Sequence, residues 1–193
     1  DQSSSRGLGD VYKRQNISPK IIVKSSVNVQ LFINSLMAKQ NNYSFTMEAE
    51  RKLSAIFASD VVGFSKMMAN DEHKTLELLH NRREVIDSLI DNNGGKVFGS
   101  AGDSLIAEFA SPIKATECAV QMQNQMSVLN EGIPEDDKMV FRVGINVGDV
   151  MATKDNLFGD AVNVAARLEA AAKPGGICLS KTMFEMINQK VQI

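Results

Sequence analysis

The order of strand-like and helix-like segments after Arg51 restricts the fold of this chain more than any other feature. An apolar run over residues 53–60 predicts a buried strand. Apolar residues one or two helical turns apart between positions 76 and 90 predict a helix with Asp71 as its N-cap. Two strands over 96–101 and 104–109, joined by a tight turn at Gly102-Asp103, predict a β-hairpin.

The second half of the chain continues the alternation. A helix is expected from the N-cap Ser111, with Pro112 at its first position. Two strands are expected over 139–147 and 150–153, around a turn at Gly148-Asp149. A helix over 160–172, a strand over 177–180 and a short helix over 182–188 are expected to follow. The order β-α-β-β-α-β-β-α-β-α predicts an α+β domain with a ferredoxin-like core, βαββαβ with additions. We expect its helices to cover one face of a central sheet.

Residues 1–46 differ in composition from the rest of the chain. They carry six basic and two acidic residues, whereas residues 47–193 carry 15 basic and 21 acidic residues. Residues 10–15, Asp-Val-Tyr-Lys-Arg-Gln, are what GAT GTG TAT AAG AGA CAG encodes, a string that resembles the end of transposon-based sequencing adapters. We interpret residues 1–46 as a non-domain segment, with 1–15 as translated adapter, and expect the folded domain at 47–193. A genuine disordered N-terminal tail is the alternative.

Charge and cysteine content exclude several classes of protein. A formal net charge of −2 does not fit the strongly basic surface of a nucleic-acid-binding protein. No uncharged apolar run approaches the roughly 18 residues that span a bilayer, so we expect no membrane segment within this chain. Cys118 and Cys178 do not form a disulfide framework, which favours a reducing compartment. We therefore expect a cytoplasmic domain without a nucleic-acid partner.

Two acidic residues stand where strands are predicted to end. Asp60 closes the first strand and Asp103 lies in the hairpin turn. The first strand and the middle hairpin are neighbours in a ferredoxin-like core, so both carboxylates can converge, and they repel each other unless cations lie between them. This favours a divalent-metal site, with Gly63 and the following helix start close to bound phosphate. On spacing alone, a helix cap at Asp60 and a simple turn at Asp103 explain the residues equally well.

A second pair of polar residues is predicted on the helix over 160–172. Asn163 and Arg167 are four residues apart and therefore share a helix face. An amide beside a guanidinium suits a phosphoryl group that gains negative charge during transfer. For an isolated Asn-x-x-x-Arg a solvated helix face is the better interpretation. The combination with Asp60 and Asp103 favours a catalytic one.

Four motifs together resemble the class III adenylyl/guanylyl cyclase catalytic domain, over about residues 51–190. They occur in the order and at the spacing of that family: Phe-x-x-Asp-x-x-Gly-Phe-Ser at 57–65, Gly-Asp-Ser at 102–104, Arg-Val-Gly-Ile-Asn at 142–146 and Gly-Asp-Ala-Val-Asn-Val-Ala-Ala-Arg-Leu-Glu at 159–169. Each motif is weak alone, and four in register are strong.

The resemblance implies roles for individual residues. Asp60, Asp103 and the main-chain carbonyl of Val61 would bind two Mg²⁺ or Mn²⁺ ions per site. Asn163 would orient the ribose, and Arg167 would stabilise the transition state. The implied nucleotide-binding positions are Val61, Gly63, Phe64, Ser65, Gly102 and Asn156.

The resemblance also implies an activity. A homodimer with shared active sites would convert a nucleoside triphosphate, ATP before GTP, into the 3′,5′-cyclic nucleotide and pyrophosphate by two-metal catalysis, in intracellular signalling. The alternative is a catalytically inactive nucleotide-binding or regulatory dimerisation module of the same fold.

Three departures from the family pattern affect this interpretation. Gly99 stands where the family usually has the lysine that selects adenine, and Asn156 stands where its partner is commonly Asp or Thr. The choice between ATP and GTP is therefore open. The family's late triphosphate-binding lysine would lie beyond Ile193, so we expect the chain to be truncated before the last strand of the domain.

Overall fold

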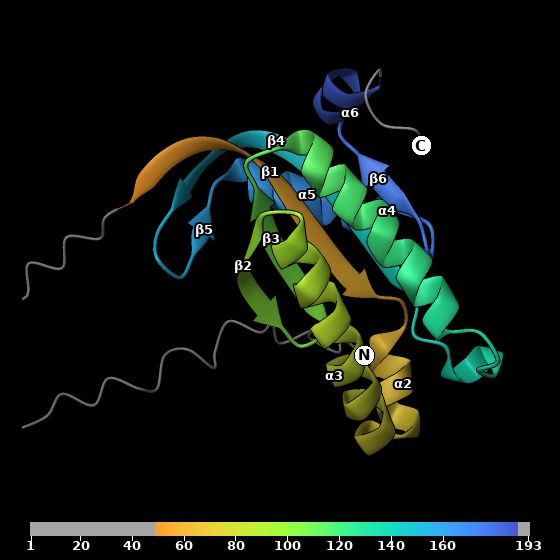
Figure 1. Ribbon diagram of the computed structural model, residues 1–193. Helices are drawn as coiled ribbons and strands as arrows, with labels where there is room; N and C mark the ends of the chain where they lie inside the picture. Colours follow the sequence, from red (N-terminus) through yellow and green to blue (C-terminus); the bar gives the residue numbers. More distant parts are fainter. Residues whose placement is uncertain (1–48, 189–193) are drawn as a thin grey trace, which may run out of the picture. The chain divides into compact units, whose positions relative to one another are not determined.

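The computed structural model describes residues 49–188, and the predicted non-domain segment at 1–46 lies outside them. The described elements are β1 (Glu50–Val61), α2 (Phe64–Asn70), α3 (Glu72–Asn92), β2 (Gly95–Ala101), β3 (Ser104–Phe109), α4 (Pro112–Leu129), the 3₁₀ helix η2 (Glu135–Asp137), β4 (Phe141–Ala152), β5 (Leu157–Phe158), α5 (Asp160–Ala171), β6 (Ile177–Leu179) and α6 (Lys181–Ile187) (Figure 1).

The sheet has the predicted ferredoxin-like topology. Its main path runs β2-β3-β1-β4-β5, and β6 pairs with β4. β3 is antiparallel to both β1 and β2, so β1 and β2 run parallel with β3 inserted between them, which is the split βαβ arrangement. β1 is the central strand, because it lies between β3 and β4 and pairs with both.

Local signals place several helix starts as predicted. Asp71 Oδ1 accepts a hydrogen bond from the Lys74 N–H at 3.0 Å and caps α3. Ser111 Oγ accepts from the Lys114 N–H at 3.4 Å and caps α4, with Pro112 in the first turn. Such caps satisfy N–H groups that have no partner within their own helix. α2, which precedes α3, was not expected from the periodicity.

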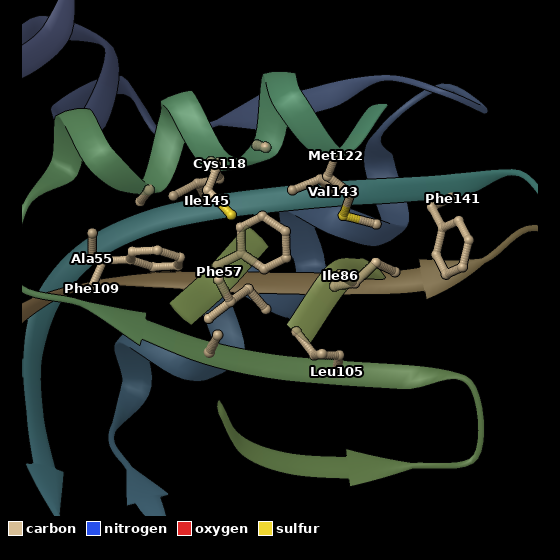
Figure 2. Close-up of a cluster of buried hydrophobic side chains, with 14 of the residues drawn as sticks. Ala55, Phe57, Ile86, Leu105, Phe109, Cys118, Met122, Phe141, Val143 and Ile145 are labelled. Atoms are coloured by element: carbon tan, nitrogen blue, oxygen red, sulfur yellow. The ribbon is translucent and has the colours of Figure 1, made fainter. Parts of the chain in front are cut away.

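Both faces of the sheet are covered, so the expectation of helices on one face was wrong. Ala55 and Phe57 of β1 belong to a large apolar cluster with α3, α4 and α6 (Figure 2). The intervening Ile56 and Ala58 pack against α5 on the opposite face. Successive strand residues point to opposite faces, and all four of these side chains are buried. The centre of β1 therefore needs cover on both sides.

The predicted turn at Gly148-Asp149 does not exist. β4 is one continuous strand from Phe141 to Ala152, and Gly148 lies opposite Ser54 of β1. A Cβ atom at Gly148 would lie 2.9 Å from the Ala161 Cβ of α5. The glycine therefore allows a helix to approach the strand closely, which is a different use of glycine from a turn.

No helix within residues 49–188 has the length and apolar character needed to cross a membrane.

Candidate functional site

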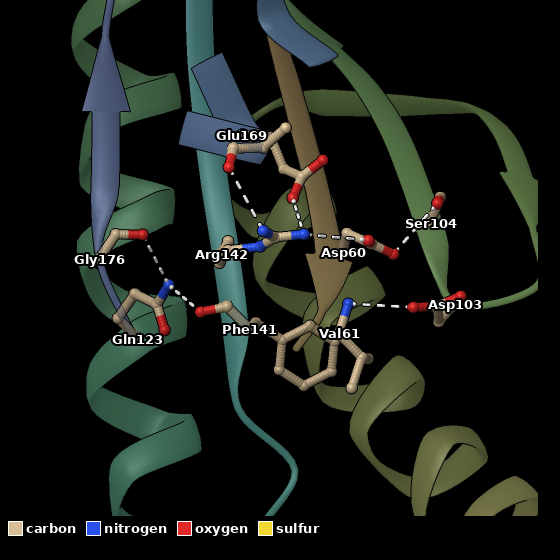
Figure 3. Close-up of polar contacts among 10 residues, drawn as sticks. Asp60, Val61, Asp103, Ser104, Gln123, Phe141, Arg142, Glu169 and Gly176 are labelled. Carbon is tan, nitrogen blue, oxygen red and sulfur yellow. Dashed lines mark hydrogen bonds and ion pairs between the residues drawn. The ribbon is translucent and has the colours of Figure 1, made fainter. Parts of the chain in front are cut away.

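The end of β1 and the β2–β3 turn bring Asp60 and Asp103 together, as their positions in the sequence predicted. Asp103 Oδ2 accepts a hydrogen bond from the Val61 N–H at 3.2 Å, which ties the hairpin turn to β1 (Figure 3). Ser104 Oγ, directly after the turn, donates to Asp60 Oδ1 at 3.1 Å. The two carboxylates thus share one location, held by β1 and by the first residue of β3.

The two carboxylates are an unfavourable pair without a cation. The pKa of Asp103 is raised from 3.8 to about 6, mainly because burial disfavours its charged form. The hydrogen bond to the Asp60 side chain and the negative charge of Asp60 raise it further. A divalent cation between the carboxylates would remove this repulsion.

The donors at this position fit Mg²⁺ or Mn²⁺. Both metals prefer oxygen ligands, and Mg²⁺ is commonly held by one or two carboxylates, with water and phosphate completing its shell. Asp60 and Asp103 supply carboxylate oxygens, and the Val61 carbonyl is the main-chain oxygen implied by the resemblance. In the part of the chain that the structure describes, no group of three or more His, Cys, Asp or Glu side chains could hold a metal.

Two residues at this site were not expected from the sequence. Arg142 of β4 pairs in register with Asp60 of β1, and its Nη2 lies 3.4 Å from Asp60 Oδ2. The same Nη2 lies 3.1 Å from Glu169 Oε1 of α5. Burial raises the pKa of Glu169, the positive charge of Arg142 lowers it, and the charges of Asp60 and Asp103 raise it. Both residues lie within the quoted motifs. The β1–β4 register accounts for the contact of Arg142 with Asp60, and the packing of α5 against β4 accounts for its contact with Glu169.

Asn163 and Arg167 share a helix face, as predicted, and that face points into solvent. Ala161 and Ala165 are buried against the sheet, whereas Asn163 and Arg167 are exposed. The nearest ion-pair partner of Arg167 is Asp160 of the same helix, at 3.8 Å, and their side chains are 75% and 85% exposed. Within the described chain, these two residues are not brought to the carboxylate pair.

The remaining predicted positions lie at or near the ends of strands. Gly63 begins α2 with φ of 70°, a left-handed conformation that favours glycine, and Phe64 after it packs against the large apolar cluster. Gly102 has φ of 61° in the hairpin turn. Ser65 and Asn156 are exposed. At Gly99 in β2, an added Cβ would meet no atom within 4 Å.

The arrangement of strand-end carboxylates, hairpin turn and α5 can be compared with known proteins. A family model described as the adenylate and guanylate cyclase catalytic domain matches residues 45–193. The chain belongs to this family. The α+β fold and the class III cyclase resemblance inferred from the motifs are thereby confirmed.

Individual cyclases are similar to this chain in sequence and structure. "Putative adenylate cyclase 3" of Rhizobium meliloti is 44% identical over 144 residues, which are 74% of this chain and 24% of that protein. A receptor-type guanylate cyclase of Caenorhabditis elegans is 28% identical over 85% of this chain and 18% of its own length. A solved adenylate/guanylate cyclase/hydrolase from Silicibacter pomeroyi is 39% identical with a TM-score of 0.71, covering 75% of this chain and 85% of that one.

The two curated relatives are much longer than this chain and differ in their named nucleotide. The chain spans about a quarter or less of the length of these two curated relatives. Their names include both adenylate and guanylate cyclases. The family membership thus identifies a cyclase catalytic domain.

Proposed function

We propose that this domain converts a nucleoside triphosphate, ATP before GTP, into the 3′,5′-cyclic nucleotide and pyrophosphate in intracellular signalling. The observation that carries the proposal is the meeting of Asp60 and Asp103 at the end of β1, in a chain that belongs to the cyclase family. The free cysteines Cys118 and Cys178 support a cytoplasmic location, where the nucleotide is available.

Asp60, Asp103 and the Val61 carbonyl would hold two Mg²⁺ or Mn²⁺ ions. When bound, the cations would lower the pKa of the ribose 3′-hydroxyl and balance the charge of the triphosphate. Asp60 is held by Ser104 through one oxygen and Asp103 by the Val61 N–H, so each carboxylate is oriented before a cation arrives. Such prior orientation reduces the reorganisation needed for reaction.

The segment after β1 is well placed for the phosphates. Gly63 turns the chain sharply, and the buried part of Phe64 anchors the turn to the core. The first turn of a helix has N–H groups without partners in that helix, and these suit phosphate oxygens. We assign Gly63, Phe64 and Ser65 to triphosphate binding, with Gly102 allowing close approach from the hairpin.

The active unit in this proposal is a homodimer with shared sites. Arg167 is two residues from Glu169, and residues two apart on an α-helix point about 200° apart. Because Glu169 points to the carboxylate side, Arg167 faces away from Asp60 of its own chain. Asn163 and Arg167 of one chain would then complete the site of the other, and two-fold symmetry would generate two such sites.

Product formation by the purified chain tests the activity. Cyclic nucleotide and pyrophosphate are measured with Mn²⁺ and with ATP or GTP. Asp60→Asn should reduce the rate at least a hundredfold because it removes a proposed metal ligand, about the effect of losing one preorganised electrostatic group. Asp149→Asn is the matched control, since Asp149 is exposed on β4, and it should retain activity. Equal rates for both variants would contradict the assignment of Asp60.

Mixing two inactive variants tests the shared site. Asp60→Ala and Arg167→Ala chains should each be nearly inactive. Random pairing makes half of the dimers mixed, each with one intact site, so the mixture should recover about a quarter of normal activity. If no activity returns although the chains exchange partners, the site lies within one chain.

A catalytically inactive nucleotide-binding module is the second candidate. Gly99 and Asn156, at the positions that usually select the base, favour it. Tight triphosphate binding with no cyclic product from either nucleotide would support this module and contradict the enzyme.

A further inference from the structure

The Arg142 side chain places a permanent positive charge beside the proposed metal ligands. Its Nη1 donates to the Ala170 carbonyl at 3.3 Å, and its Nη2 lies 3.1 Å from Glu169 Oε1 and 3.4 Å from Asp60 Oδ2 (Figure 3). The contact with Asp60 is a hydrogen bond donated by Nη2, whereas the contact with Glu169 is an ion pair without hydrogen-bond geometry. Two of the three oxygen atoms belong to α5 and one belongs to β1. The guanidinium is therefore anchored to the helix and reaches across to the metal ligand.

We propose that Glu169 is a positioning residue that controls how strongly Arg142 competes with a divalent cation for Asp60. The inference rests on the proposed function, because it takes Asp60 as a metal ligand. It concerns the residues that surround this ligand, and it links metal binding to the position of α5.

The contacts give Arg142 a second carboxylate when Asp60 binds a metal. An arginine is always charged, and a partly buried arginine without a charged partner destabilises the folded protein. Arg142 Nη2 lies 3.1 Å from Glu169 and 3.4 Å from Asp60. The Glu169 side chain is 12% exposed and that of Asp60 is 24% exposed, so solvent screens the contact with Glu169 less. Glu169 can thus retain the guanidinium while Asp60 turns to a cation.

Without Glu169, the same contacts work against metal binding. Asp60 would then be the nearest carboxylate to Arg142, and the guanidinium would compete fully for Oδ2. A cation would have to displace it and leave its charge with only the Ala170 carbonyl. Removing Arg142 as well would abolish this competition, so the effect of Glu169 on metal affinity depends on the presence of Arg142.

Direct Mn²⁺ binding to the purified chain, without nucleotide and at fixed pH and salt, tests the proposal. Free Mn²⁺ is followed by electron paramagnetic resonance. Arg142→Met should tighten Mn²⁺ binding about tenfold because it removes the competing charge. Glu169→Gln should weaken binding about fivefold in the otherwise unchanged chain. In the Arg142→Met background, Glu169→Gln should change the Mn²⁺ Kd less than about twofold, because substitutions of contacting residues have non-additive effects.

Control variants separate this inference from the proposed function. Arg51→Met removes the same charge about 30 Å away along β1, well beyond the screening length at 0.1 M salt, and should leave the Mn²⁺ Kd unchanged. Asp60→Asn should abolish Mn²⁺ binding; if it does not, the metal site itself is wrong. Arg142→Gln replaces Arg142→Met if the latter unfolds in a thermal melt.

Two results would overturn the role of Glu169 while leaving Asp60 as a ligand. One is weaker Mn²⁺ binding after the neutral substitution of Arg142. The other is an equal effect of Glu169→Gln on the Mn²⁺ Kd with and without Arg142. That result would show that the charge of Glu169 acts directly on the cation and not through Arg142.

Discussion

Asp103→Asn should make the metal-free domain more stable although it removes a proposed metal ligand. The pKa of Asp103 is raised to about 6 because burial and Asp60 disfavour its charged form. Asparagine has nearly the same shape and can still accept the hydrogen bond from the Val61 N–H. The substitution therefore removes a repulsive charge and retains the contact that holds the hairpin turn.

The sign and size of the effect follow from proton linkage. The folded-state pKa lies above the ordinary value of 3.8, so ionised Asp103 destabilises the fold fully above about pH 6 and ceases to do so below about pH 4. Without screening, the difference would correspond to about 3 kcal/mol. Because Asp103 is only partly buried, solvent reduces this, and we expect a gain of about 1 kcal/mol at pH 8.

Urea unfolding in the presence of a chelator measures this gain. At pH 8 the Asp103→Asn chain should have a higher midpoint and an unchanged slope, and at pH 4 the two midpoints should coincide. Saturating Mn²⁺ should stabilise the unsubstituted chain much more than the variant, because only the former retains both carboxylates. A variant that is less stable at pH 8, or a gain that is equally large at pH 4, would refute the reasoning.

Two further substitutions test the packing around the site. Gly144→Ala should destabilise the domain by about 3 kcal/mol or more, since its Cβ would lie 2.1 Å from the Glu169 main-chain nitrogen and would push α5 away. Thermal melting measures this loss of stability, and an unchanged melting temperature would contradict the close approach of α5 to β4. Phe57→Ala should lower the free energy of unfolding by about 3–5 kcal/mol, because this fully buried side chain fills the centre of the large cluster. Val128→Ala is the control, because that side chain is 56% exposed, and it should change the free energy of unfolding by less than about 0.5 kcal/mol.

Local patterns in the sequence determined most of the elements of this domain. The caps Asp71 and Ser111 and the hairpin turn depend on interactions between residues near each other in the chain, and the apolar run of β1 is visible in the sequence itself. The meeting of Asp60 and Asp103 could be predicted from the order of the elements: both are at strand ends, and the split βαβ order makes those strands neighbours.

Only the tertiary structure decided which residues surround that pair. Arg142 contacts Asp60 because of the β1–β4 register, and a register cannot be derived from either strand alone. The sequence predicts a turn at Gly148, because a glycine that admits a packed helix and a glycine that turns the chain look alike in sequence. The position of α5 on the second face of the sheet directs Glu169 towards the carboxylates and Arg167 into solvent. These outcomes depend on packing between distant segments, which exists only after the chain has folded.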